Sequence, residues 1–191
     1  MASLKADFNE LLQRLRQGRE FAHASFEPVY YLVFPPGQIL EVKRQTPAWV
    51  ARLRNEGWEV TVFSLAAPIV DMLRQSPLRP FWLAADRKNP LDWTRTNQAL
   101  ANALTRQDAL PARLEAVLAG LEGNDKAIVL VTELEALHPY LRIGALESQL
   151  QGKFQVPTVF LYPGIRTGKS RLKFLGFYPE DGNYRSVLVG G

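Results

Sequence analysis

Apolar and polar residues follow two different periods along this chain, and the change of period predicts its elements. Three stretches are almost continuously apolar and rich in β-branched and aromatic residues, namely Val29–Phe34, Ala127–Thr132 and Val156–Tyr162. Such runs are typical of strands that are buried on both faces of a sheet. Trp58–Phe63 alternates apolar and polar residues and predicts a fourth strand.

The segments around these strands carry apolar residues at helical spacing. They predict a helix from Leu4 that Gly18 ends, one from Thr46-Pro47 to Gly57, a short one from Pro68, and further helices at about 91–106, 111–122 and 139–151. Thr46-Pro47 is a strong start signal because threonine caps a helix and proline fits its first turn. Residues 76–93 contain three prolines, and we expect an irregular insertion or loop there.

The alternation of strands and helices predicts the fold class. Fully apolar strands separated by helices indicate an α/β protein, a three-layer sandwich with a mostly parallel sheet, similar to a degenerate nucleotide hydrolase. Pro163-Gly164 should stop the last apolar run, and the turn-rich chain after it predicts a C-terminal β-hairpin on one edge. At 191 residues we expect a single domain, 1–191.

Composition narrows the classes of function. The chain has no cysteine, which excludes disulfides and cysteine-based metal or thiol chemistry and suits a reducing cytoplasm. No apolar run approaches the roughly 18 residues of a membrane span, so we expect no membrane insertion. The net charge of +4 permits contact with nucleic acid but does not single it out.

The segment Gly164–Ser170, with the sequence GIRTGKS, invites comparison with a phosphate-binding loop. That motif needs four residues between its glycines and a helix that starts at the lysine. Here Gly164 and Gly168 enclose one residue fewer, and the chain after Ser170 alternates like a strand. We therefore interpret the segment as a hairpin turn with a basic flank.

Acidic residues follow the apolar strand Ala127–Thr132 at the edge where open parallel sheets bind their ligands. Glu133 and Glu135 are compatible with the acid of a nucleotide hydrolase, or with the first turn of a helix, which favours negative charge. A degenerate nucleotide-binding domain would use Glu133 near a metal and Lys169 near a phosphate. The two histidines, His23 and His138, fall short of a metal ligand set, so we expect no metal, no cofactor and no catalytic residue.

Basic and aromatic residues interleave near the C-terminus. The basic residues are Arg166, Lys169, Arg171, Lys173 and Arg185. Alternation on a hairpin would place Arg171 and Lys173 on one face, which could contact a DNA backbone or an acidic protein. Lysine and arginine also protect an edge strand from pairing with other chains, and this alternative stays open. The aromatic pair Phe81-Trp82 is a second candidate contact surface.

The C-terminal pattern VPTVFLYPG, LKFLG and NYR resembles the BrxB family of bacteriophage-exclusion (BREX) defence systems. The signature consists of a strand, a turn, a short strand ending in glycine and a Tyr-Arg pair, with Tyr162, Pro163, Gly164, Phe174, Gly176, Tyr184 and Arg185. The resemblance covers most of the chain in outline.

The resemblance implies a role in phage defence in the bacterial cytoplasm. Members of this family are not known as enzymes, so it implies a non-catalytic assembly or adaptor component that acts through protein–protein contacts. A PglZ-type protein is the expected direct partner, with the methyltransferase and the large ATPase of such systems as further candidates. Such a complex could also bring the chain to DNA, and the basic hairpin offers an alternative in which the chain contacts DNA itself.

Overall fold

The computed structural model describes residues 3–20, 27–106, 109–168, 170–182 and 186–191. Its centre is a sheet of parallel strands in the order β2 (Glu59–Ser64), β3 (Ala127–Thr132), β4 (Thr158–Thr167), β1 (Val29–Phe34) and β7 (Val187–Gly190). β4 runs on beyond the parallel sheet and pairs antiparallel with β5 (Arg171–Phe174), which pairs with the short β6 (Asp181–Gly182).

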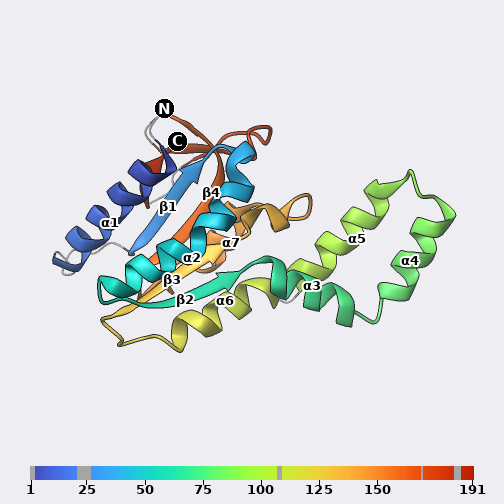
Figure 1. Ribbon diagram of the computed structural model, residues 1–191. Coiled ribbons are helices and arrows are strands. Elements are labelled where there is room, and N and C mark those ends of the chain that lie inside the picture. Colours follow the sequence, from blue (N-terminus) through green and yellow to red (C-terminus); the bar gives the residue numbers. More distant parts are fainter. Residues whose placement is uncertain (1–2, 21–26, 107–108, 169, 183–185) are drawn as a thin grey trace.

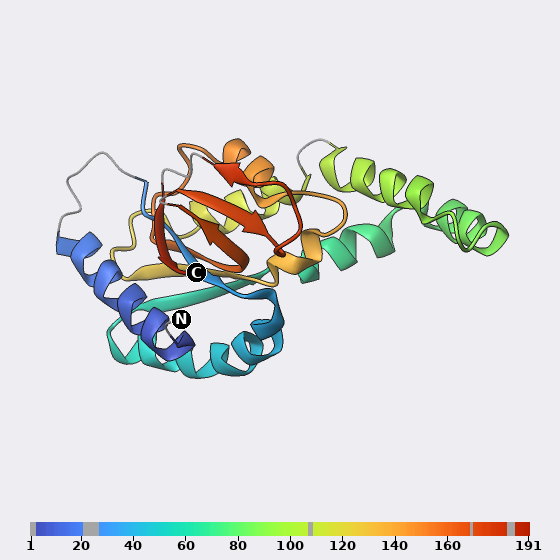
Figure 2. The same cartoon turned by 90° about the horizontal axis from the view of Figure 1, so that it is seen from above.

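Helices cover both faces of the sheet (Figures 1 and 2). One face carries α1 (Leu4–Glu20) and α2 (Ile39–Asn55). The other carries α3 (Ala66–Gln75), α6 (Ala109–Ala119), the 3-10 helix η3 (Leu134–Leu137), α7 (Ile143–Gln149) and the last turn of α5 (Trp93–Thr105). The predicted α/β class, with a mostly parallel sheet flanked by helices, is confirmed.

Strand alternation divides the apolar side chains into two cores. In β1, Tyr30 and Leu32 face the cluster under α1 and α2, whereas Tyr31 faces the cluster under the other helices. All six residues of β1 are buried, and so are all six of β3, because both strands are covered from both sides. The sequence pattern predicted the bounds of both strands correctly.

The predicted start of the second helix at Thr46 is wrong. A single turn of 3-10 helix, η1 (Pro36–Gln38), leads directly into α2, which begins at Ile39 and keeps Pro47 in its interior. The Thr46 hydroxyl donates a 2.8 Å hydrogen bond to the carbonyl oxygen of Val42 inside the helix instead of capping it. Packing outweighs the loss of one backbone bond at proline, because the buried face of α2 extends from Val42 to Leu53.

The irregular segment expected at 76–93 is also a misprediction, since α4 (Arg79–Lys88) occupies most of it. Pro80 lies in the first turn of α4, where a missing N–H costs nothing. Further along, the expected helix at 139–151 is reduced to α7 and preceded by η3. Gly18 does not end the first helix, because α1 continues to Glu20.

Pro163-Gly164 does not stop the strand that precedes it. Pro163 is the last residue of β4 opposite β1, and the next residue, Gly164, is opposite Phe174 of β5. A Cβ atom at Gly164 would lie 2.6 Å from the carbonyl oxygen of Lys173 and closer still to the Tyr162 ring. Glycine is therefore required where β4 changes its pairing partner, and the strand continues through it.

Residues 76–105 project from the sandwich as an arm, built from α4 and α5 (Figures 1 and 2). α3 leads out from the end of β2, α4 lies at the far end, and α5 returns to α6 beside the sheet. We refer to these residues as the arm.

Candidate functional site

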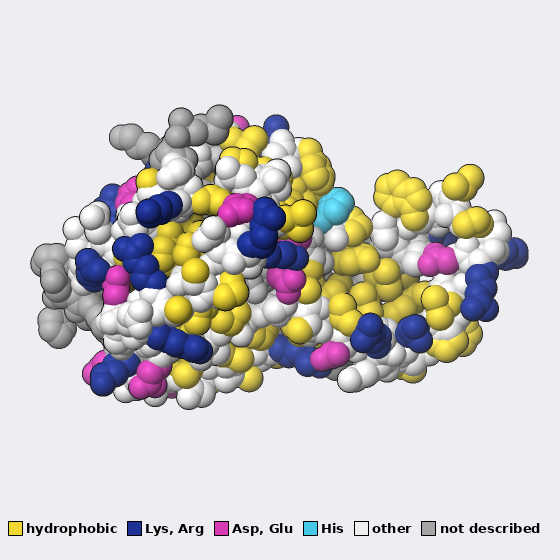
Figure 3. All heavy atoms as spheres, viewed as in Figure 1, with side chains coloured by type: hydrophobic (Ala, Val, Ile, Leu, Met, Phe, Trp, Pro, Cys, Tyr) yellow, Lys and Arg dark blue, Asp and Glu magenta, His cyan; other side chains and the backbone are white. Residues whose placement is uncertain are grey.

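The arm exposes large apolar side chains. Between Pro77 and Arg95, every residue except Trp82 is exposed. Five exposed large apolar residues lie in this stretch, with exposed fractions of 46% for Leu78, 70% for Phe81, 41% for Leu83, 91% for Leu91 and 64% for Trp93. Figure 3 shows apolar side chains gathered on the arm and on the adjoining body. Contiguous exposed apolar surface of this kind marks interaction sites.

Local contacts hold α4 in place. Trp82 is only 9% exposed, yet it belongs to neither of the two cores that cover the sheet. The Thr96 hydroxyl of α5 donates a 2.7 Å hydrogen bond to Asp86 of α4. Of the two aromatic residues proposed from the sequence as a contact surface, Phe81 points to solvent and Trp82 packs the arm together.

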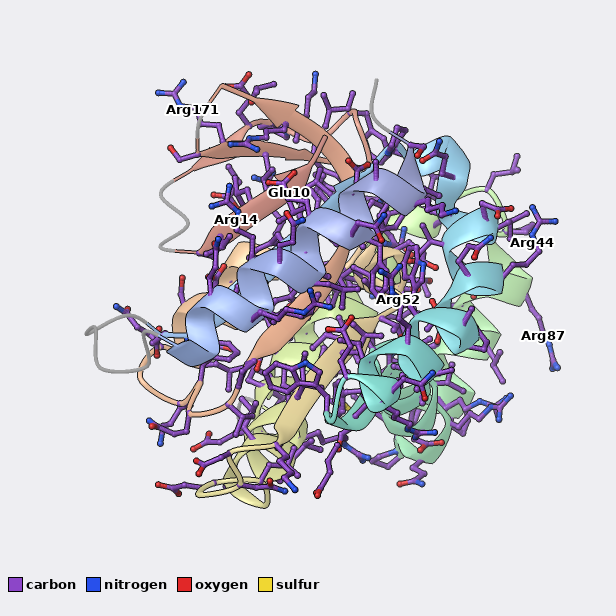
Figure 4. The ribbon with its side chains drawn as sticks, turned by 60° about the vertical axis from the view of Figure 1, so that its left-hand side comes forward. Glu10, Arg14, Arg44, Arg52, Arg87 and Arg171 are labelled. Atoms are coloured by element: carbon purple, nitrogen blue, oxygen red, sulfur yellow. The ribbon has the colours of Figure 1, made fainter. Side chains whose placement is uncertain are left out.

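The arm also carries cations that form no ion pair with another described residue. They are Arg79, Arg87, Lys88 and Arg95, and all are exposed. By contrast, α1 and α2 place several of their arginines beside carboxylates, as in the 3.3 Å pair between Arg14 and Glu10. Figure 4 shows Arg87 extending away from the ribbon, whereas Arg14 and Glu10 lie side by side. The arm therefore offers positive charge to a partner.

Most of the family-signature residues at the C-terminus are buried. Tyr162 is fully buried, and its ring centroid lies 5.6 Å from that of Phe174 and 5.7 Å from that of Tyr31. Pro163 and Gly164 are buried too, and Gly176 has a φ of +76° in the turn after β5. These residues fasten the β4–β5 pair onto the sheet. Tyr184 and Arg185 lie outside the described residues.

The basic residues of the β4–β5 pair are divided between its two faces. Arg166 is opposite the buried Leu172, whereas Lys173 is opposite the exposed Ile165. Because directly opposite residues share a face, Arg171 and Lys173 lie together and Arg166 lies on the other side. Arg171 is 3.5 Å from Glu180 and extends outward in Figure 4. Lys169 lies outside the described residues.

Glu133 and Glu135, which follow β3, both form ion pairs with one lysine of α2, and Glu133 also contacts β2. Lys43 Nζ of α2 is 3.0 Å from Glu133 Oε1 and 2.9 Å from Glu135 Oε1. The Ser64 hydroxyl at the end of β2 also donates a hydrogen bond to Glu133. The bonds from Ser64 and Lys43 both lower the pKa of Glu133, and the bond from Ser64 has the larger effect. Glu133 precedes η3 with a φ of +60° and makes no capping hydrogen bond.

The segment that invited comparison with a phosphate loop has a different geometry. Gly164–Thr167 completes β4, Gly168 has a φ of +74°, and β5 begins at Arg171 without an intervening helix. A phosphate loop places its lysine at the start of a helix, so the described residues here lack that arrangement.

His138 belongs to an aromatic cluster. Its Nδ1 atom is 2.6 Å from the Tyr178 hydroxyl, and its ring meets that of Phe177 edge-on at 5.3 Å. His23 lies outside the described residues. In the part of the chain that the structure describes, histidine and acidic residues form no group of three that could hold a metal ion. None of the described helices is long and apolar enough to cross a membrane.

A comparison with family models matches residues 62–189 to the family described as BREX protein BrxB. The chain belongs to the BrxB family. The match begins inside β2 and ends in β7, so it includes the arm and the β4–β5 pair. Searches of curated proteins and of solved structures found no match. Membership of the BrxB family makes the chain a component of BREX phage defence, with other BREX proteins as the partners that membership suggests.

Proposed function

We propose that this BrxB-family chain is a non-catalytic assembly component of a BREX complex and that it acts through protein contacts made by its arm. The observation that carries this proposal is the exposure of Phe81, Leu91 and Trp93 on a projecting segment. Buried aromatic and aliphatic anchors dominate the binding energy of protein interfaces. A monomer that leaves such residues in water gains by covering them.

A PglZ-type protein in the bacterial cytoplasm is the partner we propose, as the family resemblance implies. A non-catalytic role is supported by the polar residues at the carboxyl edge of the sheet. The Glu133 carboxylate already accepts a hydrogen bond from Ser64 and forms an ion pair with Lys43, and Lys43 also forms an ion pair with Glu135. Neither acid is placed beside an open phosphate loop.

Direct DNA binding by the β4–β5 pair is less well supported. Of the cations that the structure describes there, only Arg171 and Lys173 share a face, and Arg171 already lies near Glu180. A protein that holds DNA through its phosphates uses several cations on one surface.

The test is co-purification of the tagged chain from its native operon, in low and in high salt. We expect a PglZ-type protein to remain bound in high salt, because an apolar interface is screened little by ions. Recovery of nucleic acid that washes away with salt would favour the DNA alternative. Recovery of no BREX protein in either buffer would contradict the proposal.

A further inference from the structure

Exposed apolar side chains lie on two sides of α4. Trp82 points inward, and its neighbours Phe81 and Leu83 are separated by about 200° around the helix axis. They therefore project on opposite sides of the helix edge that carries Trp82, and both are exposed. A partner that covers both must enclose α4 rather than lie flat against it.

Both sides of α4 also carry cations. Arg79 and Arg87 are four residues before and after Leu83, so all three form one stripe along α4. Lys88 is seven residues after Phe81, two turns along the other stripe, which begins at Leu78. The Leu83 side of α4 thus has positive charge at both ends, and the Phe81 side has positive charge at its C-terminal end.

The connection to α5 continues this pattern. Leu91 is 91% exposed and Trp93 is 64% exposed, and Arg95 follows them in the first turn of α5. The only acidic residues between Pro77 and Arg95 are Asp86 and Asp92, and Asp86 already accepts the Thr96 hydrogen bond. The exposed part of the arm is therefore apolar and positively charged.

We infer that the arm inserts into a cleft of a partner protein whose floor is apolar and whose rim is acidic. Phe81, Leu83 and Trp93 would fill the floor, and the four cations would pair with carboxylates at the rim. Charge complementarity selects an acidic partner, and enclosure of two sides of α4 selects a cleft over a flat membrane surface. Leucine and phenylalanine anchors on both sides favour protein over a phosphate backbone. This inference rests on the proposed function and adds the chemistry of the surface that receives the arm.

The test reverses the charge of two cations without weakening the helices. Arg79 and Arg95 lie in the first turns of α4 and α5, where glutamate is favourable. In Arg79→Glu/Arg95→Glu we expect the affinity for the purified PglZ-type protein of the same system to fall about tenfold or more, mainly through slower association. The difference from the unaltered chain should shrink in high salt.

A matched control makes the same change of net charge elsewhere. Lys5 in the first turn of α1 and Arg113 in α6 are also exposed, and Lys5→Glu/Arg113→Glu should bind within about twofold of the unaltered chain. Circular dichroism checks that both variants keep their helices. A second variant, Phe81→Ala/Trp93→Ala, removes two anchors and should weaken binding about tenfold or more in high salt as well.

The outcomes separate the two levels of the proposal. Binding that survives both arm variants would overturn the inference and the arm as the contact surface, but would leave the role as an assembly component standing. An unaltered chain that binds no PglZ-type protein would contradict the proposed function and the inference with it. Binding of the unaltered chain to phosphatidylglycerol vesicles or duplex DNA, lost in Arg79→Glu/Arg95→Glu while protein binding is kept, would replace the acidic protein by another anionic surface.

Discussion

Glu147 holds its carboxylate between α7 and β1, where the Tyr31 hydroxyl donates a 2.6 Å hydrogen bond to it. Burial raises the pKa of this carboxyl, the Tyr31 bond lowers it in part, and the nearby Glu27 and Asp181 carboxylates raise it further. The folded state therefore binds this proton more tightly than the unfolded state does, and stability is lost as the pH rises through the raised pKa.

Glu147→Gln should relieve this penalty. Glutamine keeps an acceptor oxygen for Tyr31 but cannot ionise, so we expect the variant to unfold at a higher urea concentration than the unaltered chain at pH 7. The difference should close as the pH falls toward 4.5, the ordinary pKa of a glutamate. A variant that is less stable by the same amount at every pH would show that the carboxylate is not penalised. Glu122→Gln, an exposed acid, serves as the control and should change stability little.

Single residues also show where sequence patterns reach their limit. Phe81 and Trp82 looked equivalent in the sequence as candidates for contact, yet one is exposed and the other is the packing residue of the arm. Their difference depends on which side of α4 packs against α5, and this is set by tertiary structure that the local sequence does not show. Thr46-Pro47 has a local preference for a helix start, but burial of one face of α2 from Val42 to Leu53 outweighs that preference.

Elements that are buried from both sides were the most predictable. The strands β1 and β3 had the expected bounds, because a short, continuous apolar run with β-branched residues suits a strand that helices cover on both faces. α4 was missed because it is almost entirely exposed and leaves no apolar period in the sequence. Its prolines lie at the ends of the helix, whereas we expected them to break it.

Trp82→Ala should release α4 without unfolding the sheet. Trp82 packs outside both cores, so its loss removes the main apolar contact of α4 and little else. We expect fast amide hydrogen exchange throughout Arg79–Lys88, with exchange in β1, β3 and β4 unchanged.

The matched control is Trp49→Ala in α2. Trp49 is 6% exposed and stacks on Phe8 at 4.7 Å between ring centroids, within the core under α1 and α2. Its removal should lower the free energy of unfolding by about 3–5 kcal/mol. Global destabilisation by Trp82→Ala of the same size would mean that the arm is part of the main folding unit.

At the scale of the whole molecule, the arm is the part of the described chain that projects from the sandwich. Phe81 was found from the sequence as a candidate, but Leu91 and Trp93 were not. They lie among polar residues without a period, and only the projection of the arm shows that nothing in the described chain covers them. The C-terminal signature predicted the family correctly. Its residues Tyr162, Gly164 and Phe174 are nevertheless buried residues that pack the fold.

Hydrogen exchange of the chain, alone and mixed with the purified PglZ-type protein, tests the central claim most directly. If the arm is the contact surface, amides of α4 and of the first turns of α5 should exchange much more slowly in the mixture, while those of α1 stay unchanged. A complex in which the arm exchanges at its free rate, with protection in β5 and the turn after it or in α1, would contradict the claim.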